Sequence, residues 1–306
     1  MTPISMKHLR YFEALARLQH FGRAAEACSI SQPALSLQIR ELEDLLGSPL
    51  VERGAKQIRL TGLGETVAER AREILRAVDE VADLARLARE PLAGRLRLGV
   101  IPTIAPYLLP RVVQALTSRF PAMDLHPREA VTGRLIEELM AGRLDVAMVA
   151  LPISEPALLE TPLFEEDFFL VRPVADALKP VPALDHLHDM RLLLLEEGHC
   201  FREQAISFCK LPPSRARDLM EGSSLTTLVQ MVGAGIGVTL IPEMAIDLET
   251  RSAAVSVVAL GAPRPTRTVG LVWRKASPLA DQFARIGEVI RAVAAPSPNR
   301  HGPPAP

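Results

Sequence analysis

The most constraining feature of the sequence is one long helical pattern that divides the chain into two differently patterned parts. From Gly64 to Glu90, apolar residues recur at every third or fourth position among charged ones, and no proline or further glycine interrupts them. This periodicity predicts an amphipathic helix of about 25 residues, which is long for a globular domain. Its apolar stripe has to be covered, and a second copy of the chain is the simplest cover, with packing on its own domain as the alternative. We therefore expect a dimerisation linker helix at residues 64–92.

Length and charge limit the classes of protein that fit this chain. Its 306 residues suffice for two or three domains with sizeable cores. The net charge of −1 provides no global field for nucleic acid, so any DNA contact must come from a local surface. The sequence contains no secretory signal pattern and no apolar run near the ~20 residues of a membrane span. We expect a cytoplasmic protein with no membrane partner, in which the three cysteines form no structural disulfide framework.

The residues before the long helix have the spacing of a helix-turn-helix motif. Helical patterns cover residues 6–20, 23–28 and about 32–46, and a turn at residues 29–31 joins the last two. Ser31 can cap the third helix, with Pro33 in its first turn, where a missing N–H has no cost. Polar side chains near the start of such a helix can hydrogen-bond base edges of double-stranded DNA. The candidates on this helix are Gln32, Pro33, Ser36, Gln38 and Arg40.

A short hairpin is predicted at residues 50–61, directly after this helix. It carries Arg53, Lys56 and Arg59, which would make it a basic wing able to contact the DNA backbone. Arg53 is therefore a further candidate for DNA binding. The spacing alone equally allows a plain helical hairpin in a small domain.

Motifs throughout residues 6–65 resemble the N-terminal domain of LysR-type transcription regulators. They are Ala24-Ala25, the segment SQPALS at 31–36, IRELE at 39–43, GSPLVER at 47–53, and Leu60-Thr61 with Gly64. The resemblance implies a winged helix-turn-helix domain at residues 1–63 that binds specific DNA sequences. It also implies that the linker helix pairs two subunits.

From Arg95 onwards the pattern becomes that of an α/β domain. Strand-like runs at 96–101, 123–129 and 146–151 alternate with helical patterns at 107–120 and 133–141, which predicts a parallel sheet with helices on its faces. Later strand-like runs predict a second lobe, joined to the first by crossing strands; they lie at 168–172, 192–195, 237–241 and 268–273. This arrangement matches the two-lobed LysR effector domain, which resembles periplasmic binding proteins, at residues 93–294. The proline-rich composition of residues 295–306 predicts a disordered tail.

Two of the three cysteines, Cys200 and Cys209, lie nine positions apart after Gly198, where a helical pattern begins. A helix N-terminus favours a thiolate, as does a nearby cation, for which His199 and Arg202 are candidates. Peroxide converts a thiolate to a sulfenic acid, which a second thiol can convert to a disulfide. On one continuous helix these residues would be about 13 Å apart and on opposite faces. A disulfide needs Cα atoms within roughly 7 Å, so bonding would require the helix to unravel.

Other interpretations of the cysteines stay open on the residues alone. Cys209 also fits an inert thiol in the core, as does Cys28 on its alanine-rich helix. A zinc site from His199, Cys200 and Cys209 lacks the paired spacing of zinc-binding knuckles, so we expect no metal and no cofactor.

The stretch from Glu196 to Ala205, together with Phe208-Cys209, resembles the peroxide-sensing branch of the LysR family. The segments at 99–110, 129–132 and 267–272 support this resemblance. It implies that Cys200 reacts with hydrogen peroxide and that Cys209 resolves the product into a disulfide. It further implies a peroxide pocket that includes Thr103, Thr132, His199 and Arg267, with the arginine able to stabilise a thiolate. Without the resemblance, each threonine would be interpreted as a cap or turn residue.

The leading hypothesis is a peroxide-responsive transcription regulator and not an enzyme. It would act on promoter DNA as a homotetramer, a dimer of dimers, with RNA polymerase and a thiol reductant such as glutaredoxin or thioredoxin as further partners. One alternative is a LysR-type regulator that binds a small organic effector between its lobes. Another is a thiol peroxidase, against which the predicted DNA-binding domain argues.

Overall fold

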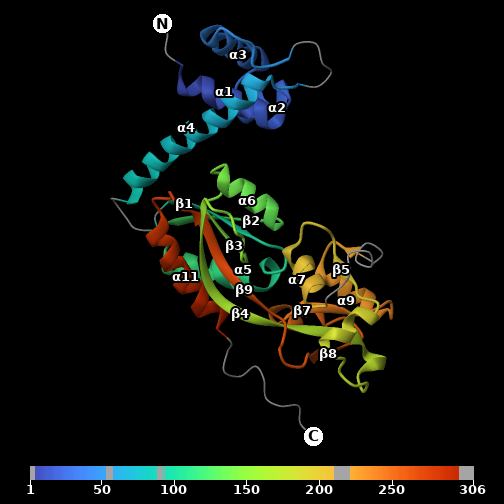
Figure 1. Cartoon of the computed structure of the whole chain (residues 1–306). Coiled ribbons are helices and arrows are strands. Elements are labelled where there is room, and N and C mark those ends of the chain that lie inside the picture. Colours follow the sequence, from blue (N-terminus) through green and yellow to red (C-terminus); the bar gives the residue numbers. More distant parts are fainter. Residues whose placement is uncertain (1–3, 53–57, 88–91, 93, 210–220, 296–306) are drawn as a thin grey trace. The chain divides into compact units, whose positions relative to one another are not determined.

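The computed structural model describes residues 4–52, 58–87, 92, 94–209 and 221–295 (Figure 1). The chain forms two compact units, residues 1–88 and 89–306, which are described separately below. Residues 296–306 of the predicted tail lie outside the described residues, as do Arg53 and Lys56 of the predicted wing. Among the helices that are described, none combines the length and apolar character that a membrane span requires.

The N-terminal unit contains the predicted helix-turn-helix. Helices α1 (Met6–Leu18), α2 (Phe21–Ala27) and α3 (Gln32–Leu46) surround a small core of buried side chains that includes Phe12, Leu15 and Leu42. The Ser31 hydroxyl accepts a hydrogen bond from the Ala34 N–H, so it caps α3 as predicted. A bridge between Val51 and Leu60 forms the base of the hairpin. This arrangement confirms the all-helical start of the chain and its motif.

The long helix of this unit is α4 (Gly62–Leu87). Its first turns pack on the core through Ala68, and Ala71 is also buried. Further along, Ile74, Val78 and Val81 are 45%, 40% and 65% exposed. Positions 74, 78 and 81 lie on one face of a helix, so α4 carries an apolar stripe that its own unit does not cover.

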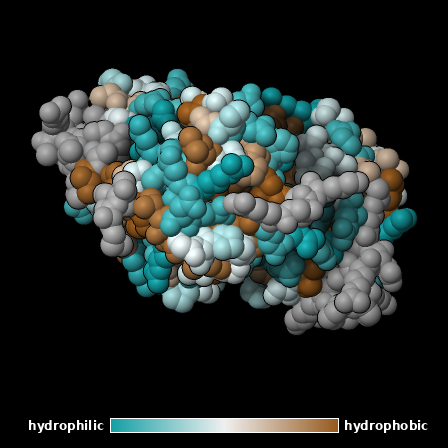
Figure 2. All heavy atoms as spheres, turned by 90° about the horizontal axis from the view of Figure 1, so that it is seen from above, coloured by the Kyte–Doolittle hydropathy of each residue, from teal (hydrophilic) through white to brown (hydrophobic). Residues whose placement is uncertain are grey.

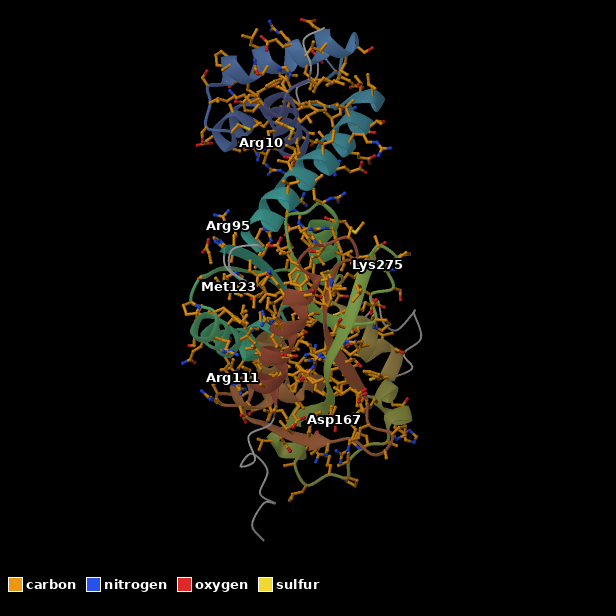
Figure 3. All side chains as sticks on the ribbon, turned by 90° about the vertical axis from the view of Figure 1, so that its left-hand side faces the viewer. Arg10, Arg95, Arg111, Met123, Asp167 and Lys275 are labelled. Carbon is orange, nitrogen blue, oxygen red and sulfur yellow. The ribbon has the colours of Figure 1, made fainter. Side chains whose placement is uncertain are left out.

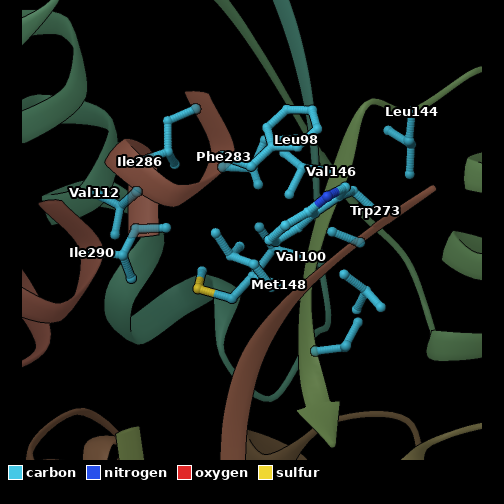
Figure 4. Packing of buried hydrophobic residues seen from close by; sticks show 14 of the residues in the cluster. Leu98, Val100, Val112, Leu144, Val146, Met148, Trp273, Phe283, Ile286 and Ile290 are labelled. Carbon is cyan, nitrogen blue, oxygen red and sulfur yellow. The ribbon is translucent and has the colours of Figure 1, made fainter. Parts of the chain in front are cut away.

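The first lobe of the C-terminal unit is a sheet with helices on its faces. Strands β1 (Gly94–Val100), β2 (Met123–Glu129) and β3 (Val146–Leu151) are parallel and are linked by α5 (Ala105–Arg119) and α6 (Thr132–Met140). The last strand, β9 (Thr266–Arg274), returns antiparallel to β3, and α11 (Ala280–Ala294) follows it. Side chains of α11 such as Phe283 pack with Trp273 and the strand residues (Figure 4).

The second lobe has its own core. It is built from β5 (Leu194–Leu195), α7 (Cys200–Phe208), β6 (Glu221–Gly222), α9 (Leu225–Gly233), β7 (Thr239–Pro242), α10 (Ile246–Glu249) and β8 (Val255–Ala259). Three short 3₁₀ helices complete it, namely η1 (Val174–Asp176), η2 (Leu184–Asp189) and η3 (Glu243–Ala245). Two cores within one unit confirm the predicted pair of α/β lobes.

Strand β4 (Leu158–Pro173) joins the two lobes and is much longer than the predicted run at 168–172. Its first part, up to Asp167, pairs with β9, and its second part pairs with β7 and β8. In the first part of β4 the apolar pairs at 158–159 and 163–164 are interrupted by Glu160, Thr161 and Pro162 and followed by three acidic residues, so no apolar run marks this part of the strand. Asp167, at the crossing, is labelled in Figure 3.

Polar residues dominate the coloured part of the face drawn in Figure 2. On the face seen in Figure 2, hydrophilic residues surround separate hydrophobic ones. Isolated exposed apolar residues of this kind are normal for a folded protein.

Candidate functional site

The predicted cysteine helix exists and begins at Cys200. Gly198 turns the chain between β5 and α7 with a φ of +94°, a conformation that favours glycine. His199 is the N-cap residue of α7, and Cys200 is the first residue of the helix. Cys200 therefore lies at a helix N-terminus, where the backbone dipoles favour negative charge.

A small pocket adjoins the Cys200 side chain. It holds about 150 Å³ of empty space, its open mouth included. Eight residues from both lobes line it, namely Ile101, Pro102, Thr103, Val131, Thr132, His199, Cys200 and Phe201. Three of the four predicted pocket residues are thus brought together with Cys200.

Thr132 contributes a buried hydroxyl to this pocket. It is the first residue of α6, but the N-cap of that helix is Val131, and no side chain caps it. Among the residues that the structure describes, the Thr132 Oγ1 atom has no hydrogen-bond partner. A buried polar atom without a partner has a free-energy cost. The capping role that the residues alone allowed therefore does not explain Thr132.

Arg267, the fourth predicted pocket residue, does not line the pocket and lies behind Thr103. Its Nη1 atom donates to the Thr103 Oγ1 at 2.8 Å, and its Nη2 atom donates to the Thr103 carbonyl oxygen at 3.0 Å. Its Nε atom donates to Glu166 at 2.7 Å. The guanidinium is therefore held by a carboxylate and by the turn that carries Thr103, instead of facing the open pocket.

His199 and Arg202, the two residues predicted as cations near the Cys200 thiol, differ in charge and in contacts. Burial lowers the pKa of His199, although Glu196 and Glu129 act in the opposite direction, so the imidazole is neutral near pH 7. Arg202 is buried, forms an ion pair with Glu221 at 2.8 Å, and donates to the Leu195 carbonyl oxygen at 3.0 Å. Arg202 thus ties the first turn of α7 to β5 and β6.

Cys209 lies in a different environment from Cys200. It ends α7 as the C-cap residue and is fully buried in the core of the second lobe, whereas the half-buried Cys200 packs against the core of the first lobe. Burial raises the pKa of the Cys209 thiol to about 12. Both thiols are free, with the helix intact between them. At ~1.5 Å per residue, their Cα atoms are about 13 Å apart along the helix axis, beyond disulfide reach.

Aromatic contacts hold α7 on β4. The ring of Phe168 lies 5.0 Å from that of Phe201 in an edge-to-face geometry, and 5.3 Å from that of Phe208. Phe201 and Phe208 occupy opposite ends of one face of α7. The Arg267 guanidinium lies 5.9 Å from the Phe168 ring centre, within cation–π range. The sequence interpretation did not include Phe168 or Glu166 among the site residues. The seven-residue spacing of Phe201 and Phe208, which puts both rings on one face of α7, could have indicated a shared aromatic partner.

The candidate DNA-binding residues lie on α3. Gln32, Pro33 and Arg40 are exposed and Ser36 is half-buried, and together they occupy one side of the helix. Gln38 lies away from this side and donates to the Glu41 carboxylate. Leu37, which was not among the predicted residues, is 56% exposed beside Arg40 and Pro33. Arg53 lies outside the described residues.

The base of the wing is anchored to α3. The buried carboxylate of Glu43 accepts hydrogen bonds from the backbone N–H groups of Leu50 and Val51, at 2.7 and 3.2 Å. This contact fixes where the chain leaves α3.

Known families account for both units. Residues 6–65 match the bacterial regulatory helix-turn-helix protein family of the LysR type, and residues 89–295 match the LysR substrate binding domain. The chain belongs to the LysR family. It is therefore a DNA-binding transcription regulator with a two-lobed effector domain, as the sequence motifs predicted.

Relatives within the LysR family extend over nearly the whole chain. The DNA-binding transcriptional dual regulator OxyR of Escherichia coli (strain K12) is 39% identical over 293 residues, which cover 94% of this chain and 95% of the relative. The hydrogen peroxide-inducible genes activator of Haemophilus influenzae is 37% identical, with 94% and 96% covered. The regulator EstR of Acinetobacter baylyi is also 37% identical, with 95% and 97% covered.

Solved structures of LysR proteins show the same architecture. A cysteine variant of full-length OxyR from Pseudomonas aeruginosa has a TM-score of 0.75 at 37% identity, covering 94% of this chain and 98% of that one. A cysteine variant of Corynebacterium glutamicum OxyR with bound H₂O₂ has a TM-score of 0.66 at 34% identity, covering 94% and 92%.

Proposed function

We propose that this LysR-family regulator senses hydrogen peroxide through a reversible Cys200–Cys209 disulfide and controls oxidative-stress genes in the cytoplasm. The observation that carries the proposal is the position of Cys200, at a helix N-terminus beside a small pocket with two threonine side chains. The Haemophilus influenzae relative, named as a hydrogen peroxide-inducible genes activator, supports the same function.

The proposed chemistry takes place in two steps. The Cys200 sulfur attacks one peroxide oxygen, the O–O bond breaks, and the departing oxygen takes up a proton and leaves as water. The sulfenic acid at Cys200 is then attacked by the Cys209 sulfur, which forms the disulfide and releases a second water. Two thiols are oxidised and one peroxide is reduced. A reductant such as thioredoxin or glutaredoxin would return both thiols by exchange.

The second step is the switch. With α7 folded, Cys209 is too distant to reach Cys200, and its raised pKa keeps it protonated. Unravelling of α7 would remove both obstacles, because it shortens the separation and exposes the thiol to water. The disulfide would then hold the second lobe in a changed local fold.

Disulfide formation would change how the protein binds promoter DNA. Gln32, Ser36 and Arg40, which share one side of α3, would contact bases or phosphates, with Pro33, Gln38 and Arg53 as further candidates. The exposed stripe of α4 would pair two subunits, and two such pairs would form a tetramer that places several recognition helices on one promoter. RNA polymerase would be the partner of an activating complex.

Cys200→Ser tests the function directly. This variant should bind the promoter like the unsubstituted protein but lose the change in footprint when peroxide is added. Cys28→Ser, which removes the thiol of the DNA-binding unit, should keep the peroxide response. DNase footprinting with peptide mapping of thiols, before and after stoichiometric peroxide, measures both. A footprint that still shifts in Cys200→Ser would refute the proposal.

A regulator that responds to a small organic effector is the second candidate, since residues 89–295 match the LysR substrate binding domain. Thermal-shift screening against small metabolites distinguishes the two. A clear rise in melting temperature with one metabolite, and no Cys200–Cys209 bond after oxidation, would favour the effector.

A further inference from the structure

A buried ion pair lies behind the pocket. Glu166 of β4 and Arg267 of β9 face each other in the antiparallel register of the two strands that cross between the lobes. Their side chains are almost completely buried, and the Arg267 Nε atom donates to the Glu166 Oε1 at 2.7 Å. The Glu166 carboxylate also accepts the backbone N–H of Met244. Arg267 is therefore clamped in one orientation by a carboxylate that is itself fixed.

The clamped guanidinium determines which way the Thr103 hydroxyl can act. A guanidinium has five N–H donors and no acceptor, so at the 2.8 Å contact the Thr103 Oγ1 must be the acceptor. The second contact, from Arg267 to the Thr103 carbonyl oxygen, holds the turn in place. The hydroxyl hydrogen forms no other bond among the described residues and remains free to donate. Because Thr103 lines the pocket, the pocket is where this donor is available.

We propose that Glu166 is a positioning residue for the peroxide reaction. Through Arg267 it holds the Thr103 hydroxyl as a hydrogen-bond donor to the departing oxygen of peroxide. When the Cys200 sulfur bonds to one oxygen and the O–O bond breaks, the electron pair goes to the other oxygen, which needs a donor until it is protonated to water. A fixed donor aimed at developing charge accelerates such a step. This inference rests on the proposed peroxide function.

The test compares two reagents on the full-length reduced protein. Glu166→Gln keeps the size of the side chain but removes the charge that orients Arg267. We expect the rate constant of Cys200 oxidation by hydrogen peroxide to fall roughly tenfold, as expected for a weakened donor. The rate of Cys200 alkylation by iodoacetamide should stay unchanged or rise, because iodide leaves without an O–H donor and the negative charge of Glu166 no longer offsets the positive charge of Arg267. Quenching followed by mass spectrometry of the Cys200 peptide measures both rates.

Two further variants locate the effect in Thr103. Thr103→Val should lower the peroxide rate at least as much as Glu166→Gln does, and the double variant should be no slower than Thr103→Val within about twofold, since both changes remove one interaction. Glu166→Asp keeps the charge on a shorter side chain, so its peroxide rate constant should fall less than that of Glu166→Gln. The Asp variant replaces the Gln variant in the test if the Gln variant does not fold.

Any of four outcomes would overturn the inference: an unchanged peroxide rate in Glu166→Gln, equal losses with both reagents in that variant, additive losses in the double variant, or an Asp variant as slow as the Gln variant. If Cys200 of the unsubstituted protein fails to react with peroxide in the same assay, the proposed function fails as well. A fast unsubstituted protein with an unaffected Glu166→Gln variant refutes the positioning role alone.

Discussion

Cys200 and Cys209 are the same residue type in one short helix, yet the two thiols have different surroundings. Cys200 is half-buried at the helix N-terminus beside a pocket, and Cys209 is enclosed by the apolar core of the second lobe. Burial penalises the thiolate, which is why the pKa of Cys209 is raised. A difference of this kind fits a reactive thiol and a resolving thiol that is withheld until the helix opens.

The raised pKa of Cys209 predicts a loss of stability at alkaline pH. Between about pH 9 and about pH 12 the folded protein keeps a proton on Cys209 that the unfolded chain has lost. The contribution of the buried Cys209 thiol to the free energy of unfolding is therefore fully present below pH 9. It declines as the pH rises above that value, by about 1 kcal/mol per pH unit. Urea unfolding of the reduced protein at several pH values measures it. The stability advantage over Cys209→Ala should narrow above pH 9, whereas parallel curves would contradict the prediction.

At the scale of elements, α7 is the part whose stability would set the response under the proposed function. It has only nine residues, from Cys200 to Phe208, too few to be stable as an isolated helix. Its stability must come from tertiary contacts, chiefly the two phenylalanines on Phe168 and the Arg202 ion pair with Glu221. A helix held by few contacts can open locally while the rest of the lobe stays folded.

Phe208→Leu should increase opening of α7. An aromatic pair contributes about 0.5–1.5 kcal/mol beyond its buried area, so the open state should become up to about tenfold more populated. Alkylation of Cys209 in the folded, reduced protein should become faster by the same factor. Phe164→Leu is the matched control, because Phe164 is half-buried but packs on the other lobe. Equal Cys209 labelling in both variants would show that the Phe168–Phe208 contact does not restrain the helix.

At the scale of the whole molecule, the signal has to pass from the effector domain to the DNA-binding unit of each subunit. The apolar stripe of Ile74, Val78 and Val81 on α4 remains uncovered within its own unit. Pairing of two α4 helices would cover these side chains and place two recognition helices on one operator, since half-site spacing follows the geometry of the dimer.

Ile74→Glu tests the pairing of α4. A carboxylate in the centre of an apolar interface loses its hydration without a partner, which should weaken dimerisation by several kcal/mol. Sedimentation should then show a smaller species, and operator affinity should fall. Arg72→Glu introduces the same carboxylate on the opposite side of α4 and should leave the assembly intact. An unchanged sedimentation coefficient for Ile74→Glu would place the subunit interface elsewhere.

Local patterns were sufficient for the helix-turn-helix, the long α4 and the alternation of strands and helices. Caps such as Ser31 and periodic apolar residues act between neighbours along the chain, so they can be recognised in the sequence. The spacing of Cys200 and Cys209 likewise indicated that a folded helix keeps them apart. The full length of β4 could not be predicted from the sequence, because its acidic residues interrupt the apolar pattern.

The environment of the site depends on contacts between distant residues. Arg267 meets Glu166 from 101 positions away and Thr103 from 164 positions away, so it lies behind the pocket and not in its wall. Phe168 receives both phenylalanines of α7, and Cys209 is buried in one lobe while Cys200 faces the other. Such pairings arise when two lobes pack around crossing strands, and the local preferences of the residues do not specify them. The sequence alone therefore identifies the candidate reactive residues, and the packed fold sets their partners, burial and charge.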